Sequence, residues 1–336
     1  MRKVLALLLV FVLALGMLAG CSSNTSTSTT EAATTAAAGG ESTDKVFRVA
    51  YIARAQADSF AAWLANAVME EADKYDNITV DVFDGQANDD IENGLIENAI
   101  TNKYDAIIVQ PNNGEAQRPY VEKAVAAGIV TITTNARISG IEGASSVDAD
   151  PYLQAKVNAD AAVEQIPQNA KVVVLLGPPG NFHADARRDS WQKEFFDKRP
   201  DVTIVGEEIA NWNKDEAMNY METWVQANDQ IDAIIAMNDN MAAGALEVIK
   251  DNAKFSNILA YGVDGTAEAC LLIQEGKLTS TSLQSAYALA EGLLDTSNKL
   301  LTGQETQIDI DIDCPLITKD NVAEYIEMHK KAGAIQ

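Results

Sequence analysis

The chain has 336 residues, with 25 Lys or Arg against 49 Asp or Glu, and a formal net charge of −24. This acidic excess argues against a nucleic acid or an anionic lipid surface as partner, because both bind through basic patches. Three cysteines and two histidines are too few for a disulfide scaffold or an ordinary zinc site. We therefore predict no metal and no cofactor. Cys270 and Cys314 are expected to be buried free thiols, although a pairing stays open.

The first 21 residues have the pattern of a bacterial secretion signal. Met1-Arg2-Lys3 is a basic start, an apolar run extends from Val4 to Met17, and Leu18-Ala19-Gly20-Cys21 follows directly. A transmembrane helix is the alternative, but the run is shorter than the ~20 apolar residues that cross a bilayer. The small residues before the cysteine resemble the lipobox of bacterial lipoproteins. The resemblance implies a signal peptide at residues 1–20 and an acylated Cys21.

A polar stretch separates this signal from the rest of the chain. Nineteen of the 23 residues from 22 to 44 are Ser, Thr, Ala or Gly, which is the composition of a flexible tether. We expect residues 21–45 to hold the folded body at the outer face of the cell membrane. A lipid anchor of this kind suits a Gram-positive cell, from which a freely secreted protein would be lost.

From residue 46 onward, short β-branched runs alternate with amphipathic stretches of helical period. The predicted strands are 46–53, 78–83, 105–110, 129–134, 171–176, 202–209, 232–236, 257–263 and 278–283. The predicted helices are 60–75, 89–103, 114–127, 151–166, 184–198, 214–228, 240–250 and 285–301. This alternation is typical of an α/β fold with parallel sheets covered by helices. Two lobes fit the usual size of a domain better than one sheet of about ten strands.

Ligands of such folds bind at the carboxyl ends of the strands. The residues that follow the predicted strands include many hydrogen-bonding side chains and two aromatic ones. They are Arg54, Asp58, Phe60, Asn135, Arg137, Asn181, His183, Arg187, Trp212, Asn238, Asp264 and Gln284. Between two of these elements, Gly177-Pro178-Pro179-Gly180 lacks the spacing and the lysine of a phosphate-binding loop. We predict an ordinary strand–turn–helix corner there.

Several of these segments together resemble one known family. They are VAYIARAQADSFAAWLANAVMEEA (49–72), LLGPPGNFHADARRDSW (175–191), ANWNKDEAMNYMETW (210–224), IAMNDNMAAGAL (235–246), YGVDGTAEA (261–269) and KLTSTSLQSA (277–286). The chain resembles the periplasmic sugar-binding proteins of the ribose/galactose type, which have the type I periplasmic binding protein fold. The resemblance implies two Rossmann-like lobes with parallel sheets, joined by a three-strand hinge. It places residues 46–148 and 285–313 in the N-terminal lobe, and residues 149–284 and 314–336 in the C-terminal lobe.

The resemblance also implies roles for single residues. Asp58 and Phe60 match an acidic and an aromatic residue of the first strand end, and Trp212 matches the aromatic that stacks on the opposite sugar face. Arg187 matches an arginine that reaches the ring oxygen and hydroxyls. Asn135, Asn238, Asp264 and Gln284 match the remaining polar ligands. Asn181 and His183 depart from the galactose-type pattern, and Arg54 stands where relatives carry a smaller or uncharged residue, so that it adds a contact or narrows the pocket.

Most of these residues also have a structural interpretation. Asp58 and Asn238 can be helix caps, and Asp264 before a glycine can belong to a turn. Phe60 and Trp212 can belong to the core. In favour of a sugar site, carboxylates and amides suit vicinal hydroxyls, and aromatic rings suit the C–H faces of a sugar.

The resemblance implies a monomeric, non-catalytic lipoprotein of an ABC transporter. It would close its lobes on a monosaccharide, either an aldohexose such as galactose or glucose or a pentose, and deliver it to a membrane permease. A receptor for a sugar or for autoinducer-2, feeding a sensor kinase, is the alternative. A repressor of the same core fold would need a basic helix-turn-helix in place of the lipobox. An enzyme is disfavoured because no nucleophile elbow, metal cluster or cofactor loop is visible in the sequence.

Overall fold

A computed structural model describes residues 45–335. The predicted signal, the acylation site at Cys21 and nearly all of the tether therefore lie outside the described residues. The described part of the chain forms two lobes, each with a mostly parallel six-stranded sheet, as the fold class predicts. None of the helices described is both long enough and apolar enough to cross a membrane.

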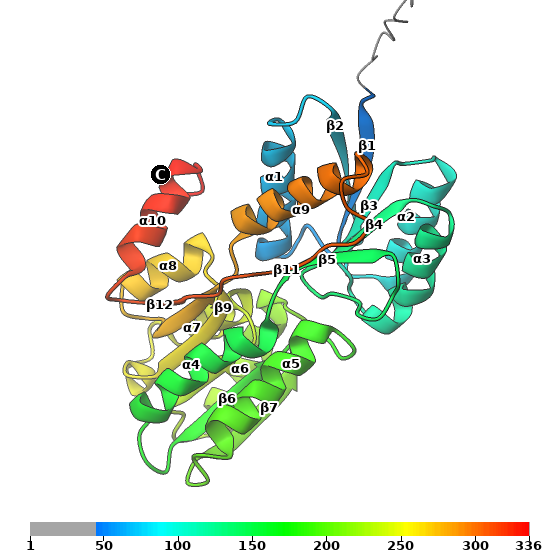
Figure 1. Cartoon of the computed structure of the whole chain (residues 1–336). Helices are drawn as coiled ribbons and strands as arrows, with labels where there is room; N and C mark the ends of the chain where they lie inside the picture. The colour runs from blue at the N-terminus through cyan, green and yellow to red at the C-terminus, as the bar shows by residue number, and fades with distance from the viewer. Residues whose placement is uncertain (1–44, 336) are drawn as a thin grey trace, which may run out of the picture. The chain divides into compact units, whose positions relative to one another are not determined.

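The N-terminal lobe is built around the first sheet, whose strand order is β11-β5-β4-β3-β1-β2 (Figure 1). Its strands are β1 (Phe47–Ala53), β2 (Ile78–Asp84), β3 (Ala106–Val109), β4 (Val130–Thr134), β5 (Ala144–Ala149) and β11 (Asp309–Ile312). Its helices are α1 (Ser59–Ala72), α2 (Asp89–Thr101), α3 (Gly114–Ala126) and α9 (Ala286–Leu301).

The C-terminal lobe is built around the second sheet, of order β12-β10-β9-β8-β6-β7. Its strands are β6 (Lys171–Leu176), β7 (Thr203–Ile209), β8 (Ala233–Ala236), β9 (Leu259–Asp264), β10 (Ser280–Leu283) and β12 (Leu316–Thr318). Its helices are α4 (Pro151–Gln165), α5 (Phe182–Trp191), α6 (Lys214–Ala227), α7 (Asp239–Ile249), α8 (Ala267–Gln274) and α10 (Val322–Lys331), with the short helices η1 (Gln192–Phe196) and η2 (Ala253–Phe255).

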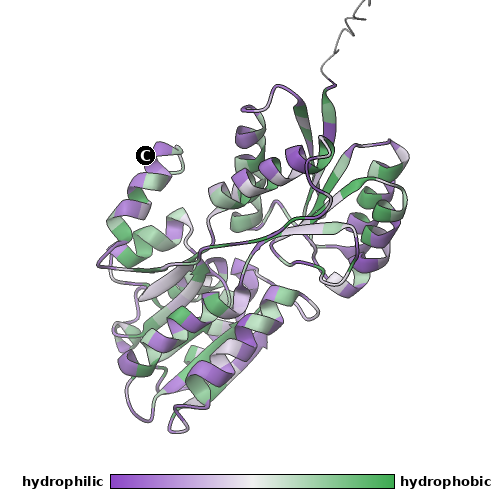
Figure 2. Cartoon of the chain, in the orientation of Figure 1, coloured by the Kyte–Doolittle hydropathy of each residue, from purple (hydrophilic) through white to green (hydrophobic). Residues whose placement is uncertain are grey.

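Each sheet is buried on both faces, which explains the apolar runs in its strands. Along β1, Val49, Tyr51 and Ala53 pack with α1 and α9, whereas Ala50 and Ile52 pack with α2 and α3. Successive side chains of a strand point to opposite faces, so that one strand serves two cores. Figure 2 shows hydrophobic residues along most of β6, while the helices carry hydrophilic residues on one side.

The chain passes between the two sheets three times. β5 leads into α4 across residue 150, β10 leads into α9 across residues 284–285, and β11 leads into β12 across residues 313–315. β12 pairs antiparallel with β10. These crossings are the three-strand hinge, and they bring the carboxyl ends of both sheets to the same region between the lobes.

Six elements were missed by the sequence-based prediction: β5, β11, β12, α8, α10 and the short helix η2. β5 has the sequence ASSVDA and is wholly buried, but its small polar residues lack the β-branched signal of the other strands. β11 and β12 have only four and three residues and belong to the hinge. Cys270 and Cys314 are buried free thiols, as predicted.

Candidate functional site

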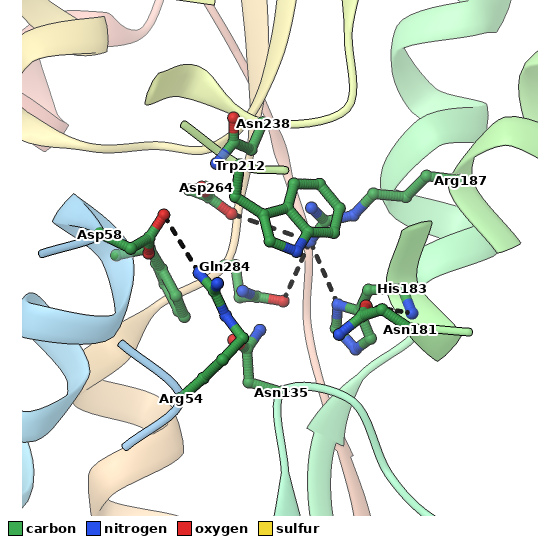
Figure 3. Close-up of a pocket in the computed structure, with 11 residues that line it drawn as sticks. Arg54, Asp58, Asn135, Asn181, His183, Arg187, Trp212, Asn238, Asp264 and Gln284 are labelled. Atoms are coloured by element: carbon green, nitrogen blue, oxygen red, sulfur yellow. Dashed lines mark hydrogen bonds and ion pairs between the residues drawn. The ribbon is translucent and has the colours of Figure 1, made fainter. Parts of the chain in front are cut away.

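Eleven of the twelve predicted site residues line one cavity between the lobes (Figure 3). The cavity has an empty volume of about 290 Å³. Its lining residues are Arg54, Asp58, Phe60, Asn135, Asn181, His183, Arg187, Trp212, Asn238, Asp264 and Gln284. Residues from both lobes take part, because the carboxyl ends of both sheets face this region.

Arg137 is the predicted site residue that the structure does not bring to this cavity. The backbone at Asn135 and Ala136 has positive φ angles of 50° and 151°, and this reversal directs Arg137 away from Asn135. The Arg137 side chain forms ion pairs with Asp148 and Asp311 instead. Arg137 therefore holds the end of β5 to the hinge strand β11 and lines a separate surface groove.

Two aromatic side chains form apolar walls of the cavity. Phe60, on the first turn of α1, is buried and meets Trp63 edge to face, with ring centroids 5.8 Å apart. Trp212 follows β7 in a left-handed backbone conformation with φ of 62°. Its ring lies against Gly177, where a Cβ atom would come within 2.2 Å of it. Gly177 is thus the residue that makes room for the Trp212 ring.

Asp58 caps α1 and also lines the cavity. Its Oδ1 accepts a hydrogen bond of 2.8 Å from the Ala61 amide at the start of α1. Its Oδ2 faces Arg54 Nη2 at 3.2 Å, in an ion pair whose side chains are both at least nine-tenths buried. The Arg54 charge is therefore balanced inside the cavity wall.

Arg187 enters the cavity from α5 and is held by groups of the protein. Its Nε and Nη2 donate to Gln154 Oε1 at 3.0 and 2.8 Å, and its Nη1 donates to the Met237 carbonyl at 2.7 Å. Its Nη2 lies 3.7 Å from Asp264 Oδ1. Burial lowers the pKa of Arg187, and the Asp264 carboxylate opposes this shift. The guanidinium is thus a fixed positive charge beside Asp264.

His183 uses both ring nitrogens within the protein. Nδ1 lies 3.2 Å from Arg187 Nη2, which can only donate, and Nε2 lies 2.9 Å from Asp148 Oδ1. The ring is therefore the tautomer with its proton on Nε2. Burial lowers the pKa of His183, although Asp148 opposes this shift. A neutral His183, held by Asp148 of β5, thus orients Arg187 one turn further along α5.

Four other polar side chains keep hydrogen-bonding groups free for a ligand. Asp264 is 2 % exposed, yet among the described residues no donor reaches its carboxylate within hydrogen-bond distance. Gln284 Nε2 is buried without a partner. Asn135 and Asn238 each accept through Oδ1, from Gln110 and from the Met241 amide, and no bond of their Nδ2 groups to a described residue is seen. Burial raises the pKa of Asp264 well above 3.8, with Arg187 opposing the shift.

The comparison with known proteins identifies the family. Residues 49–305 match the model of the periplasmic binding protein domain. This chain belongs to the periplasmic binding protein family. It is a type I periplasmic sugar-binding protein of the kind that serves ABC importers, as the resemblance of its motifs implies.

Two curated relatives show how much of this binding protein is shared. The D-apiose import binding protein of Paraburkholderia graminis is 31% identical over 256 residues, which cover 74% of this chain and 80% of the relative. The xylitol-binding protein of Mycolicibacterium smegmatis is 29% identical over 244 residues, 72% of this chain and 69% of the relative. By name, these relatives are binding proteins.

Solved structures agree with the fold. A solute-binding protein of Bacillus halodurans with bound myo-inositol is 26% identical and covers 86% of this chain and 99% of its own, with a TM-score of 0.78. One from Actinobacillus succinogenes with bound D-allose is 27% identical and covers 83% of this chain and 100% of its own, with a TM-score of 0.76.

Two buried glutamines of this binding protein shape the site but were missed from sequence. Gln110, directly after β3, accepts from the Arg54 amide at 3.1 Å and donates to Asn135 Oδ1 at 2.6 Å. Gln154, inside α4, accepts from Arg187 and donates to Gln284 Oε1 at 2.7 Å. Gln110 ends the predicted strand 105–110, and this position is the signal by which it could have been found. Nothing in the sequence distinguishes Gln154 from other polar residues of its helix.

Proposed function

We propose that this binding protein captures a neutral monosaccharide or polyol between its lobes and delivers it to an ABC permease. The carrying observation is the set of uncommitted polar groups that face one cavity between two aromatic side chains. Asp264 offers acceptors, and the amide groups of Asn135, Asn238 and Gln284 offer donors. Adjacent hydroxyls both donate and accept, so a polyhydroxylated ligand can satisfy both kinds of group.

The charges of the side chains that line the cavity support a neutral ligand. Arg54 and Arg187 are matched by Asp58 and Asp264, so that no formal charge is left for a charged ligand to neutralise. A sugar phosphate or a uronate would bring a buried charge without a counter-charge, which is costly.

Entry to this site requires the lobes to move apart. The lining residues of both lobes are buried, with Arg54 at 6 %, Arg187 at 2 % and Gln284 at 1 % exposure. A ligand that contacts both lobes favours the arrangement in which they are together, because only there does it make all of its contacts. Capture and lobe closure are therefore one coupled process in this proposal.

The names of the relatives support this ligand class without choosing a member of it. Xylitol, D-apiose, D-allose and myo-inositol are all neutral and polyhydroxylated. We keep aldohexoses and pentoses as candidate ligands beside these compounds.

Binding without turnover fits the chemistry of the lining side chains. The lining residues include no Ser, Thr, Cys or Lys that a neighbouring base could activate as a nucleophile. Hydrolysis by a pair of carboxylates would need two free acids. Asp58 is occupied by the α1 cap and by Arg54, which leaves Asp264 alone. We therefore propose that the protein is not an enzyme.

We further propose that Cys21 anchors the protein to the outer face of the cell membrane, as a monomer near its permease. The lipobox at Leu18–Cys21 and the polar stretch behind it support this. A tethered binding protein stays at a high effective concentration beside its partner. Cys21→Ser should release the protein from the membrane fraction into the medium. Retention of this variant in the membrane fraction would contradict the anchor.

Isothermal titration tests the proposed ligand class. Neutral sugars and polyols, including xylitol, D-ribose, D-apiose, D-allose and myo-inositol, would be titrated beside D-galacturonate and ribose 5-phosphate. At least one neutral compound should bind, and neither charged compound should bind as well. Tighter binding of a charged compound, or heat from none of the neutral ones, would sink the proposal.

A further inference from the structure

The Gly177–Asn181 turn contacts the opposite lobe. It leads from β6 into α5 in the C-terminal lobe and lies against residues 111–114, which lead from β3 into α3 in the N-terminal lobe. Three hydrogen bonds join the two segments. Asn181 Nδ2 donates to the Pro111 and Asn112 carbonyls at 3.3 and 3.2 Å, and the Gly114 amide donates to the Gly180 carbonyl at 3.2 Å. We call residues 177–181 the closing turn.

Asn181 faces the cavity, but its amide is committed to the protein. Its Oδ1 accepts from the His183 and Ala184 amides at 3.0 and 3.2 Å and so caps α5. Its Nδ2 has two hydrogens, and both are accounted for by the two carbonyls of the N-terminal lobe. Asn181 is 2 % exposed. It therefore has no donor left for a ligand, unlike Asn135 and Asn238.

Gly180 allows the close approach on which these bonds depend. It has a φ of +78°, and a Cβ atom there would lie 3.1 Å from the Asn113 side chain. Its carbonyl accepts from the first amide of α3, a group that has no partner within its own helix. The second glycine of the Gly-Pro-Pro-Gly motif thus serves contact between the lobes, and the first, Gly177, serves the Trp212 ring.

We propose that the closing turn is a latch, and that Asn181 is a positioning residue that strengthens binding without touching the ligand. Asn181 lies outside the three hinge crossings, so its bonds to Pro111 and Asn112 break when the lobes part for ligand entry. Each bond stabilises the closed arrangement whichever ligand is inside. The apparent dissociation constant rises in inverse proportion to the closed, binding-competent fraction. Loss of the latch therefore raises the dissociation constant of every ligand by the same factor.

This inference rests on the proposed function, and its test compares several ligands. Asn181→Ser keeps an oxygen that can cap α5, because serine caps helices about as well as asparagine, but its side chain is too short to reach Pro111. Asn181→Asp keeps a stronger cap and removes both donors. Asn88→Ser is the matched control, since Asn88 caps α2 through the Ile91 amide and is exposed. Asp264→Asn is the contrast, because it removes an acceptor that contacts the ligand directly.

Each variant would be titrated with every compound among xylitol, D-ribose, D-apiose, D-allose and myo-inositol that binds the wild type. Asn181→Ser should raise the dissociation constant about thirtyfold, as expected for the loss of two hydrogen bonds of about 1 kcal/mol each. The factor should be the same for each ligand, whereas the factor for Asp264→Asn should differ between ligands. Asn88→Ser should change nothing. The latch is overturned if the fold-change in dissociation constant caused by Asn181→Ser varies with the ligand. It is also overturned if neither Asn181 variant changes the dissociation constant.

A ligand-free measurement separates failure of the latch from failure of the proposed function. If no compound binds the wild type, the proposed function fails, and the latch is judged by distances between spin labels on Glu122→Cys and Asp189→Cys. Both positions are exposed, one in each lobe, while Cys270 and Cys314 are buried. Asn181→Ser should shift the distribution to longer distances, because the closed arrangement loses its bonds. An unchanged distribution overturns the latch in that case.

Discussion

Substitution of Asp264 by Asn should weaken ligand binding and stabilise the protein at the same time. Among the described residues the Asp264 carboxylate has no hydrogen-bond donor, and its charge partner Arg187 is 3.7 Å away. Hydrogen bonds to a charged acceptor contribute ~1.5–3 kcal/mol, against about 1 kcal/mol for neutral ones. Asn keeps one acceptor and loses the charge. We expect the free energy of ligand binding to fall by about 2 kcal/mol, which corresponds to a dissociation constant about thirtyfold higher.

The gain in stability follows from the pKa of Asp264. Burial raises this pKa well above 3.8, so folding disfavours the ionised form that the unfolded chain adopts above pH 4. The neutral amide of the Asp264→Asn variant carries no such penalty. The melting temperature of this variant without ligand should exceed that of the wild type at pH 8, and the difference should shrink toward pH 4. Calorimetric titration and thermal unfolding measure the two effects, with Asp189→Asn, at an exposed position, as the charge-matched control. Unchanged affinity, or a lower melting temperature at pH 8, would refute the reasoning.

Two further substitutions test the burial and the packing around the site. Burial raises the pKa of Glu92 from 4.5 to about 8, so the folded protein binds a proton that the unfolded chain releases above pH 4.5. In urea unfolding, Glu92→Gln should therefore be more stable than the wild type by about 3 kcal/mol at pH 7, with no gain near pH 4.5. Equal stability of the two proteins at pH 7 would contradict the raised pKa of Glu92. Gly177→Ala should displace the Trp212 ring, shift its fluorescence and weaken binding at least tenfold, since the new Cβ would lie 2.2 Å from that ring. Gly94→Ala, in a helix with open space around it, should leave binding unchanged and stabilise the fold slightly; equal effects of the two alanines on binding would contradict the packing argument.

The shared position of the carboxyl ends of parallel strands explains why so many residues of the cavity could be predicted from sequence. Parallel strands place their carboxyl ends at one edge, so side chains far apart in the chain, such as Arg54 and Gln284, meet without any signal of their own. A position directly after a strand does not determine the direction in which a side chain points. Arg137 follows β4 just as Asn135 does, but the backbone reversal between them sends it to Asp148 and Asp311.

What the sequence leaves undetermined depends on contacts between distant segments. Gln154 reaches Arg187 and Gln284 from the first turns of α4, where a polar residue usually faces solvent. The commitment of Asn181 to the opposite lobe is equally invisible, because its partners are the backbone carbonyls of Pro111 and Asn112. Such groups carry no residue-type signal, so that their roles appear only in three dimensions.

A crystal structure of the protein with its tightest-binding neutral sugar or polyol would show directly where and how the ligand binds. We expect the ligand to lie in the cavity between the lobes, with the Asp264 carboxylate accepting from its hydroxyls and the amide groups of Asn135, Asn238 and Gln284 donating to it. Phe60 and Trp212 should contact its C–H faces. A ligand bound outside this cavity, or inside it without a hydrogen bond to Asp264, would contradict the proposed binding site.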